Sequence, residues 1–97
     1  MTVKIIGLIR LKDANAFETY RSQVGATVAR YQGTVAARGK VTHLYWDQLQ
    51  TGGFGAFVEL QFPSADEAAR WAASPEYQAL LAVRAQAMDL TLFQVED

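Results

Sequence analysis

The hydrophobic period of this chain switches repeatedly between two residues and about 3.6 residues, and this order limits the fold more than any other feature. Strand-like alternation covers residues 3–11, 34–46, 54–62 and 90–95, and helix-like spacing covers residues 17–31 and 65–88. Two strand–helix–strand halves joined by a hairpin predict an α+β, ferredoxin-like β-α-β-β-α-β fold. We therefore expect residues 1–97 to form a single domain, with four antiparallel strands and both helices on one face of the sheet.

Capping residues support the bounds of the first helix. Asp13 or Asn15 is a suitable N-cap, and Gly33 suits the C′ position just beyond the helix. Gly25 stands inside the helix, where glycine costs about 1 kcal/mol relative to alanine. We expect close packing to explain this glycine.

Glycines also mark the middle of the chain. Residues 34–46 are polar for a strand, which is typical of a sheet edge, and Gly39 is predicted to lie at a β-bulge. Gly52 and Gly53 supply the positive φ angles that a hairpin requires. The helical stretch after Pro63 has two starts, with Ser64 and Ser74 as N-caps.

Apolar residues on both faces of two strands predict a partner surface. A sheet covered by one helix layer normally exposes a polar second face. Here Ile6 and Leu8 point away from the residues that meet the helices, and Phe57 does the same on the third strand. Burial of each side chain is worth about 1.5–3 kcal/mol, so we expect a face-to-face homodimer with two-fold symmetry. The alternative is a monomer with an exposed apolar face.

Composition excludes several functional classes. Nine Lys and Arg against ten Asp and Glu give a net charge of −1, which argues against a nucleic-acid partner. The absence of cysteine excludes disulfides, thiolate metal sites and thiol catalysis. The apolar stretches are too short to span a bilayer, and the N-terminal residues do not have the pattern of a signal peptide. We expect a cytoplasmic protein with no membrane partner.

Several segments resemble the domain of unknown function 1330 family of dimeric α/β-barrel proteins. The segments are residues 17–21, 31–33, 37–39, 58–64, 68–69, 71 and 74–78, of which 62–78 are the most specific. The resemblance implies a ferredoxin-like fold and a homodimer whose sheets form a barrel, with no established reaction. The chain departs from the family pattern at Lys40 and at residues 43–48, where the family commonly has an acidic stretch. Related barrels include cofactor-free oxygenases of aromatic polyketides, lactone isomerases and haem-binding enzymes, although a shared fold does not fix function.

His43 is the one side chain expected to titrate near neutrality without special help. By strand alternation it shares a face with Val41 and Tyr45. His43 is then either a general base or a haem ligand, or else a polar residue at the edge of the sheet. A single histidine without a carboxylate cluster does not make a metal site. We therefore predict no metal and no cofactor.

Aromatic and basic side chains give the ligand-binding candidates. Four aromatic residues lie on or beside the helices, where they either line a small-molecule pocket or fill the core. Two arginines present a fork suited to a carboxylate, or else form surface ion pairs. The candidates are Tyr20, Tyr31, Trp71, Tyr77, Arg38 and Arg84.

Three functions therefore remain open. The first is a homodimeric protein that binds an apolar or aromatic small molecule between helices and sheet. The second is a cofactor-free oxygenase or isomerase of a small aromatic or lactone substrate, with His43 or a tyrosine as base and Arg38 or Arg84 for an oxyanion. The third is a structural or interaction domain with a filled core.

Overall fold

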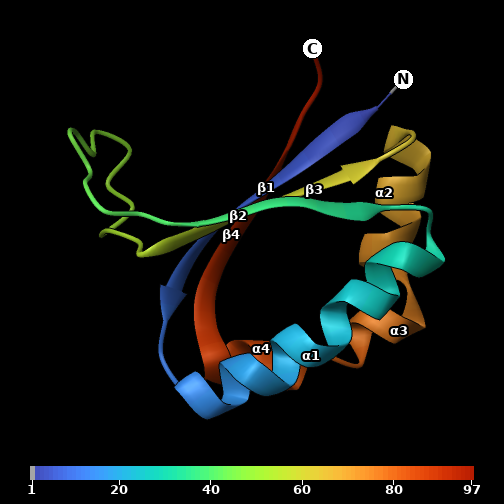
Figure 1. Ribbon diagram of the computed structural model, residues 1–97, viewed down its shortest axis with the longest axis horizontal. Helices are drawn as coiled ribbons and strands as arrows, with labels where there is room; N and C mark the ends of the chain where they lie inside the picture. The colour runs from blue at the N-terminus through green and yellow to red at the C-terminus, as the bar shows by residue number, and fades with distance from the viewer. Residues whose placement is uncertain (1) are drawn as a thin grey trace.

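A computed structural model describes residues 2–97 as four strands and four helices. The first half contains β1 (Val3–Leu11), α1 (Ala14–Arg30) and β2 (Thr34–Lys40). The second half contains β3 (Ala56–Phe62), α2 (Ala65–Ala73), α3 (Pro75–Gln78), α4 (Leu81–Ala87) and β4 (Met88–Val95). The strand order in the sheet is β2-β3-β1-β4, and all neighbouring strands are antiparallel. The helices lie on one side of this sheet (Figure 1), so the predicted ferredoxin-like α+β fold is confirmed.

Helix α1 begins and ends with specific backbone bonds. The Asp13 side chain accepts hydrogen bonds from the N–H groups of Asn15 and Ala16, so Asp13 is the N-cap. At the other end Gln32, with φ of 66°, occupies the C′ position that we predicted for Gly33. The Gln32 and Gly33 N–H groups bond to the carbonyls of Ala29 and Val28, which forms a Schellman motif.

Gly33 is required for close packing rather than for its φ angle. A Cβ atom at this position would lie 2.6 Å from the Phe62 ring and 2.8 Å from Val28 Cγ1. By contrast, no atom lies within 4 Å of a Cβ built on Gly25. Close packing therefore does not explain Gly25, and our expectation for it was wrong.

The second strand is shorter than predicted. β2 ends at Lys40, and residues 41–55 form a loop that projects beyond the ends of β2 and β3, away from the helices (Figure 1). We call residues 41–55 the arm. The Asp47 carboxylate organises the arm by accepting hydrogen bonds from Thr51 N, Thr51 Oγ1 and Gly52 N. Gly52 and Gly53 have φ angles of 82° and 91°, as the hairpin prediction required.

A β-bulge in β2 determines which of its side chains face the helices. The register shifts between Val35, which pairs with Leu60, and Ala37, which pairs with Glu59. Paired residues share a face of the sheet, and one extra residue in a strand moves every later side chain to the other face. Arg38 and Lys40, paired with Val58 and Ala56, therefore face the helices. The bulge lies earlier in the strand than the predicted position at Gly39.

Two further bounds differ from the prediction. The last predicted helix is divided into α3 and α4 around Ala79 and Leu80, and β4 begins at Met88 rather than at Leu90. Ser64 and Ser74 cap α2 and α3 as expected, because their hydroxyls accept hydrogen bonds from Glu67 N and Tyr77 N. The buried core lies between the sheet and the helices. Its largest fully buried side chains are those of Phe62, Val3 and Val28.

The opposite face of the sheet has an apolar centre. Leu8 pairs with Phe57 on β3, and Ile6 pairs with Phe93 on β4. Phe93 and the nearby Val95 remain 44% and 37% exposed, and no helix covers this side (Figure 1). The predicted two-sided apolar pattern is present, and β4 extends it.

Candidate functional site

A cavity of about 390 Å³ lies between α1 and the sheet, near the β2 edge. This volume is within the range of small-molecule sites. Its lining side chains come from α1, α2 and all four strands. They are Ile9, Phe17, Tyr20, Arg21, Val24, Val35, Arg38, Lys40, Ala56, Val58, Leu60, Trp71, Met88, Leu90 and Leu92, with further wall from Gly39, Gly55 and Phe57.

The cavity is apolar inside and positively charged at its mouth. Trp71, Met88 and Leu60 are buried, with 2%, 3% and 5% of their surface exposed. Arg38 and Lys40 are exposed and lie at the rim together with Arg21. No Asp or Glu is among the lining residues.

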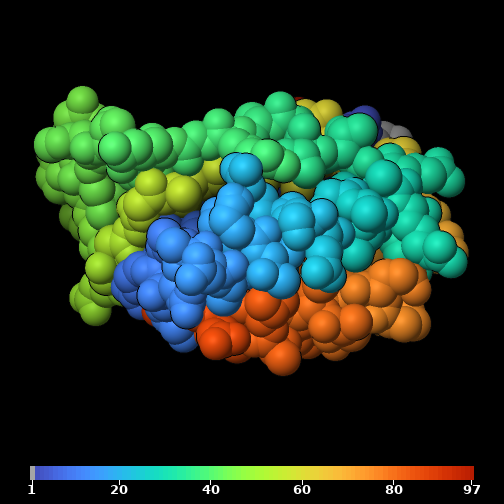
Figure 2. All heavy atoms as spheres, turned by 60° about the horizontal axis from the view of Figure 1, so that its bottom comes forward, coloured from blue at the N-terminus to red at the C-terminus, as the bar shows by residue number. Residues whose placement is uncertain are grey.

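Two local features of the structure bring these cations to the mouth of the cavity. On α1, Phe17, Tyr20, Arg21 and Val24 follow the i, i+3, i+4, i+7 spacing of one helix face, so Arg21 shares the apolar face. On β2, the bulge turns Arg38 and Lys40 toward α1. Figure 2 shows α1 in blue and cyan, between β2 and the arm in green and the α3–α4 segment in orange.

A hydrogen-bond chain supports the tyrosine in the cavity wall. The hydroxyls of Tyr20 and Tyr77 lie 2.9 Å apart, and Arg84 Nη1 donates to Tyr77 Oη at 2.8 Å. Because Tyr77 Oη already accepts from Arg84, its own hydrogen is available for donation to Tyr20. In that arrangement the Tyr20 hydroxyl keeps its own hydrogen for a further acceptor.

Burial keeps Tyr20 neutral. Desolvation of the phenol is the main cause that raises the pKa of Tyr20 above its ordinary value, and the neighbouring Tyr77 raises it further. A phenol with a raised pKa is a poor general base at neutral pH. Tyr20 is therefore suited to donating or accepting a hydrogen bond rather than to removing a proton.

The other aromatic candidates have different surroundings. Trp71 lines the cavity and donates from Nε1 to Thr27 Oγ1 at 3.1 Å. The Tyr77 ring packs against Trp71, with ring centroids 4.4 Å apart and an angle of 46° between the planes, and Tyr77 is not among the lining residues. Tyr31 points elsewhere, since its hydroxyl donates to Glu76 Oε1 at 2.6 Å and Arg70 lies over its ring. Of the six ligand-binding candidates, three line the cavity, namely Tyr20, Arg38 and Trp71. Tyr77 and Arg84 support the cavity wall through hydrogen bonds. Tyr31 lies outside the cavity.

His43 lies in the arm and does not line the cavity. The prediction that it stands on a strand was wrong, because β2 has ended before it. Its ring contacts Tyr45, with centroids 4.3 Å apart, and both side chains are exposed. The geometry gives His43 no cavity in which to act as a base.

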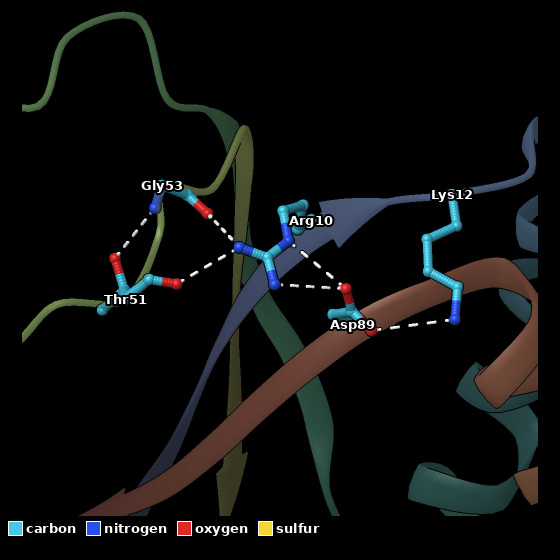
Figure 3. Close-up of polar contacts among 5 residues, drawn as sticks. All are labelled: Arg10, Lys12, Thr51, Gly53 and Asp89. Atoms are coloured by element: carbon cyan, nitrogen blue, oxygen red, sulfur yellow. Dashed lines mark hydrogen bonds and ion pairs between the residues drawn. The ribbon is translucent and has the colours of Figure 1, made fainter.

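A charged cluster fixes the base of the arm. Arg10 donates to Asp89 through Nε and Nη2, at 3.3 and 3.2 Å, and its Nη1 donates to the carbonyls of Thr51 and Gly53 (Figure 3). Lys12 Nζ lies 3.7 Å from the other Asp89 oxygen. Arg10 therefore links β1, β4 and the arm.

Sequence reasoning missed Arg21 and Lys40 at the mouth and most of the aliphatic wall. Arg21 was not among the candidates, although its spacing from Phe17 and Val24 marks it as part of the apolar face of the helix. Lys40 was missed because its orientation depends on the bulge.

Two properties of the described residues bear on other classes of function. Among residues 2–97, no helix combines the length and the apolar character needed to cross a membrane. In the same part of the chain, no three His, Asp or Glu side chains gather in a way that suits a metal ion.

Comparisons with known proteins identify relatives. A sequence profile of the family described as domain of unknown function (DUF1330) matches residues 2–97. No curated protein matches the sequence. Among solved structures, RPA0582 from Rhodopseudomonas palustris, of unknown function, has a TM-score of 0.83 and 19% identity, covering 99% of this chain and 82% of that one.

Two further solved structures share the fold. A dimeric ferredoxin-like protein of unknown function from Thermobifida fusca has a TM-score of 0.65 and 19% identity, with 100% and 92% coverage of this chain and of that one. SnoaB, a cofactor-independent oxygenase from Streptomyces nogalater, has a TM-score of 0.69 and 14% identity, with 99% and 92% coverage. At these identities the likeness shows the fold alone.

Proposed function

This chain belongs to the DUF1330 family of unknown function. We propose that it is a homodimeric protein that binds an apolar small molecule in the cavity between α1 and the sheet. The observation that carries the proposal is the cavity itself, about 390 Å³ in volume and lined mostly by aliphatic and aromatic side chains. A filled core would leave no such space, because protein interiors are normally close-packed.

The geometry favours binding over base-dependent catalysis. An oxygenase or isomerase of the kind considered above needs a base beside its substrate. His43 lies outside the cavity, and the raised pKa of Tyr20 keeps that phenol protonated. The likeness to SnoaB is compatible with the enzyme alternative but concerns only the fold.

Calorimetric titration and thermal-shift assays test the binding function. We expect small aromatic and aliphatic compounds to raise the melting temperature in proportion to their affinity, since a ligand of the folded state stabilises it by mass action. The variant Val24→Phe fills the cavity from α1 and should abolish binding. The matched control Ala26→Phe alters an exposed position of the same helix and should bind normally. Equal binding by both variants would place the ligand elsewhere.

The dimer part of the proposal rests on the uncovered face of the sheet. Ile6, Leu8, Phe57 and Phe93 form an apolar surface that pairing with a second copy would bury. The dimeric ferredoxin-like protein from Thermobifida fusca shows that this fold supports dimers.

The arm carries further exposed apolar side chains. Tyr45, Trp46 and Leu49 are 78%, 81% and 91% exposed, which is unusual for such large apolar side chains. The Asp47 hydrogen bonds and the Arg10 contacts hold the arm in place. We therefore extend the dimer proposal to contact between the arm and the partner.

Light scattering after size-exclusion chromatography tests the dimer. We expect the wild-type protein to have twice the monomer mass at micromolar concentration, and Phe93→Lys to have the monomer mass. Gln94→Lys is the matched control, because it adds the same charge on the neighbouring residue, whose side chain faces the other side. A wild-type monomer would refute this part of the proposal.

A further inference from the structure

The distribution of charge in the cavity limits the chemistry of its ligand. The inner wall offers aliphatic and aromatic groups with the Tyr20 hydroxyl as its candidate polar group, whereas all the formal charge lies at the mouth. A ligand that is charged at both ends, or along its length, would have to bury a charge without a partner. The complementary molecule is therefore apolar at one end and charged at the other.

The charge at the mouth is positive and largely unopposed. Within residues 2–97, neither Arg38 nor Lys40 has a carboxylate within ion-pair distance, and Arg21 has an exposed contact of 3.5 Å with Glu18. Arg38 and Lys40 are two residues apart on the same face of β2, so their backbones are about 7 Å apart. This spacing brings both cations within reach of one carboxylate.

We propose that the ligand is an apolar monoanion, a small aromatic or aliphatic carboxylate. Its carboxylate contacts Arg38 and Lys40, and its apolar part extends toward Trp71 and Met88. The Arg38 guanidinium offers a carboxylate two parallel N–H donors. This inference rests on the proposed binding function and adds the ligand class to it.

Pairs of acids and their isosteric amides test the charge requirement on the wild-type protein. Binding of 1-naphthoate and 1-naphthamide, and of octanoate and octanamide, is measured by isothermal titration calorimetry at pH 7. We expect each acid to bind at least about tenfold more tightly than its amide, because hydrogen bonds to a charged group are the stronger ones. Added salt should weaken binding of the acids and leave the amides nearly unchanged.

Single and double variants test which side chains contact the ligand carboxylate. Arg38→Gln and Lys40→Gln should each reduce affinity for the acids, and the double variant R38Q/K40Q should remove the preference for acid over amide. Arg70→Gln is the control, since it removes the same charge from an exposed side chain of α2 outside the cavity lining. It should retain the preference. Circular dichroism confirms that each variant is folded.

The possible results separate the ligand class from the binding function. If acids and amides bind the wild-type protein equally, the inference is wrong and the binding function stands. An acid preference that survives in R38Q/K40Q also overturns the inference, because the carboxylate must then lie elsewhere. If neither acids nor amides bind, the proposed function fails together with the inference.

Discussion

The buried pair of tyrosine hydroxyls supports the cavity wall, and its contribution to stability can be measured. Tyr20 and Tyr77 are 8% and 3% exposed, and their hydroxyls are 2.9 Å apart. Tyr77→Phe removes the hydroxyl that joins Tyr20 to Arg84 and leaves the buried Tyr20 hydroxyl without its partner. An unsatisfied buried polar group costs about 1–3 kcal/mol, which is the expected loss in the free energy of unfolding.

The reverse substitution should cost less. In Tyr20→Phe the Tyr77 hydroxyl still accepts a hydrogen bond from Arg84, so the loss should be near the net value of one hydrogen bond, about 0.5–1.5 kcal/mol. The double variant leaves neither hydroxyl unsatisfied. Its loss should therefore be smaller than the sum of the two single losses by about 1 kcal/mol.

Urea denaturation gives the three free energies at a fixed protein concentration, since the stability of a dimer depends on concentration. Additivity of the single losses within about 0.5 kcal/mol would mean that the two hydroxyls are not coupled. In that case the hydrogen-bond chain would have no energetic role in holding Tyr20 at the cavity wall.

Three further predictions concern other parts of the chain. Gly25→Ala should stabilise the protein by about 1 kcal/mol and raise the melting temperature by about 4–8 °C, measured by calorimetry, since nothing obstructs the added methyl group. The pKa of Asp47 is lowered mainly by hydrogen bonds from Thr51, so the order of the arm should be lost as pH falls below the usual carboxyl range. Trp46 fluorescence should report that loss, and Asp47→Asn should abolish its pH dependence while loosening the arm at neutral pH. The pKa of Tyr20 is raised in the folded state, so above about pH 10 this tyrosine ionises in the unfolded state first, and the free energy of unfolding should fall. The fall should be less steep in Tyr20→Phe. Urea denaturation between pH 8 and 11 measures both.

The sheet and its two faces were predictable because hydrophobic alternation reports them directly. Ile6 and Leu8 stand between residues that meet the helices, and the structure places them on the uncovered face. The apolar spacing of Phe17, Tyr20 and Val24 indicates one face of α1, and in the structure these three residues line the cavity. Arg21 shares that face, and the same spacing would have identified it.

The orientation of Arg38 was not predictable from alternation. The bulge lies at Ala36 and Ala37, two identical residues whose hydrophobicity cannot indicate which strand face each one occupies. The position of His43 was mispredicted for a different reason. Residues 41–46 alternate as a strand does, but β2 ends at Lys40 and these residues enter the arm, whose turn is formed by local hydrogen bonds from Thr51 and Gly52 to Asp47.

The β-bulge in β2 affects both the charge at the cavity mouth and the charge on the uncovered face of the sheet. If β2 kept the same residues but paired regularly, without the bulge, Arg38 would lie opposite Phe57 and both Arg38 and Lys40 would turn outward. Of the three cations that line the cavity, Arg21 alone would then remain at its mouth. On a two-fold dimer axis, the outward cations would also add like charge to both facing sheets. Among homologues that keep the length of this strand and its basic residues, ligand charge and assembly should therefore vary with the presence of the bulge.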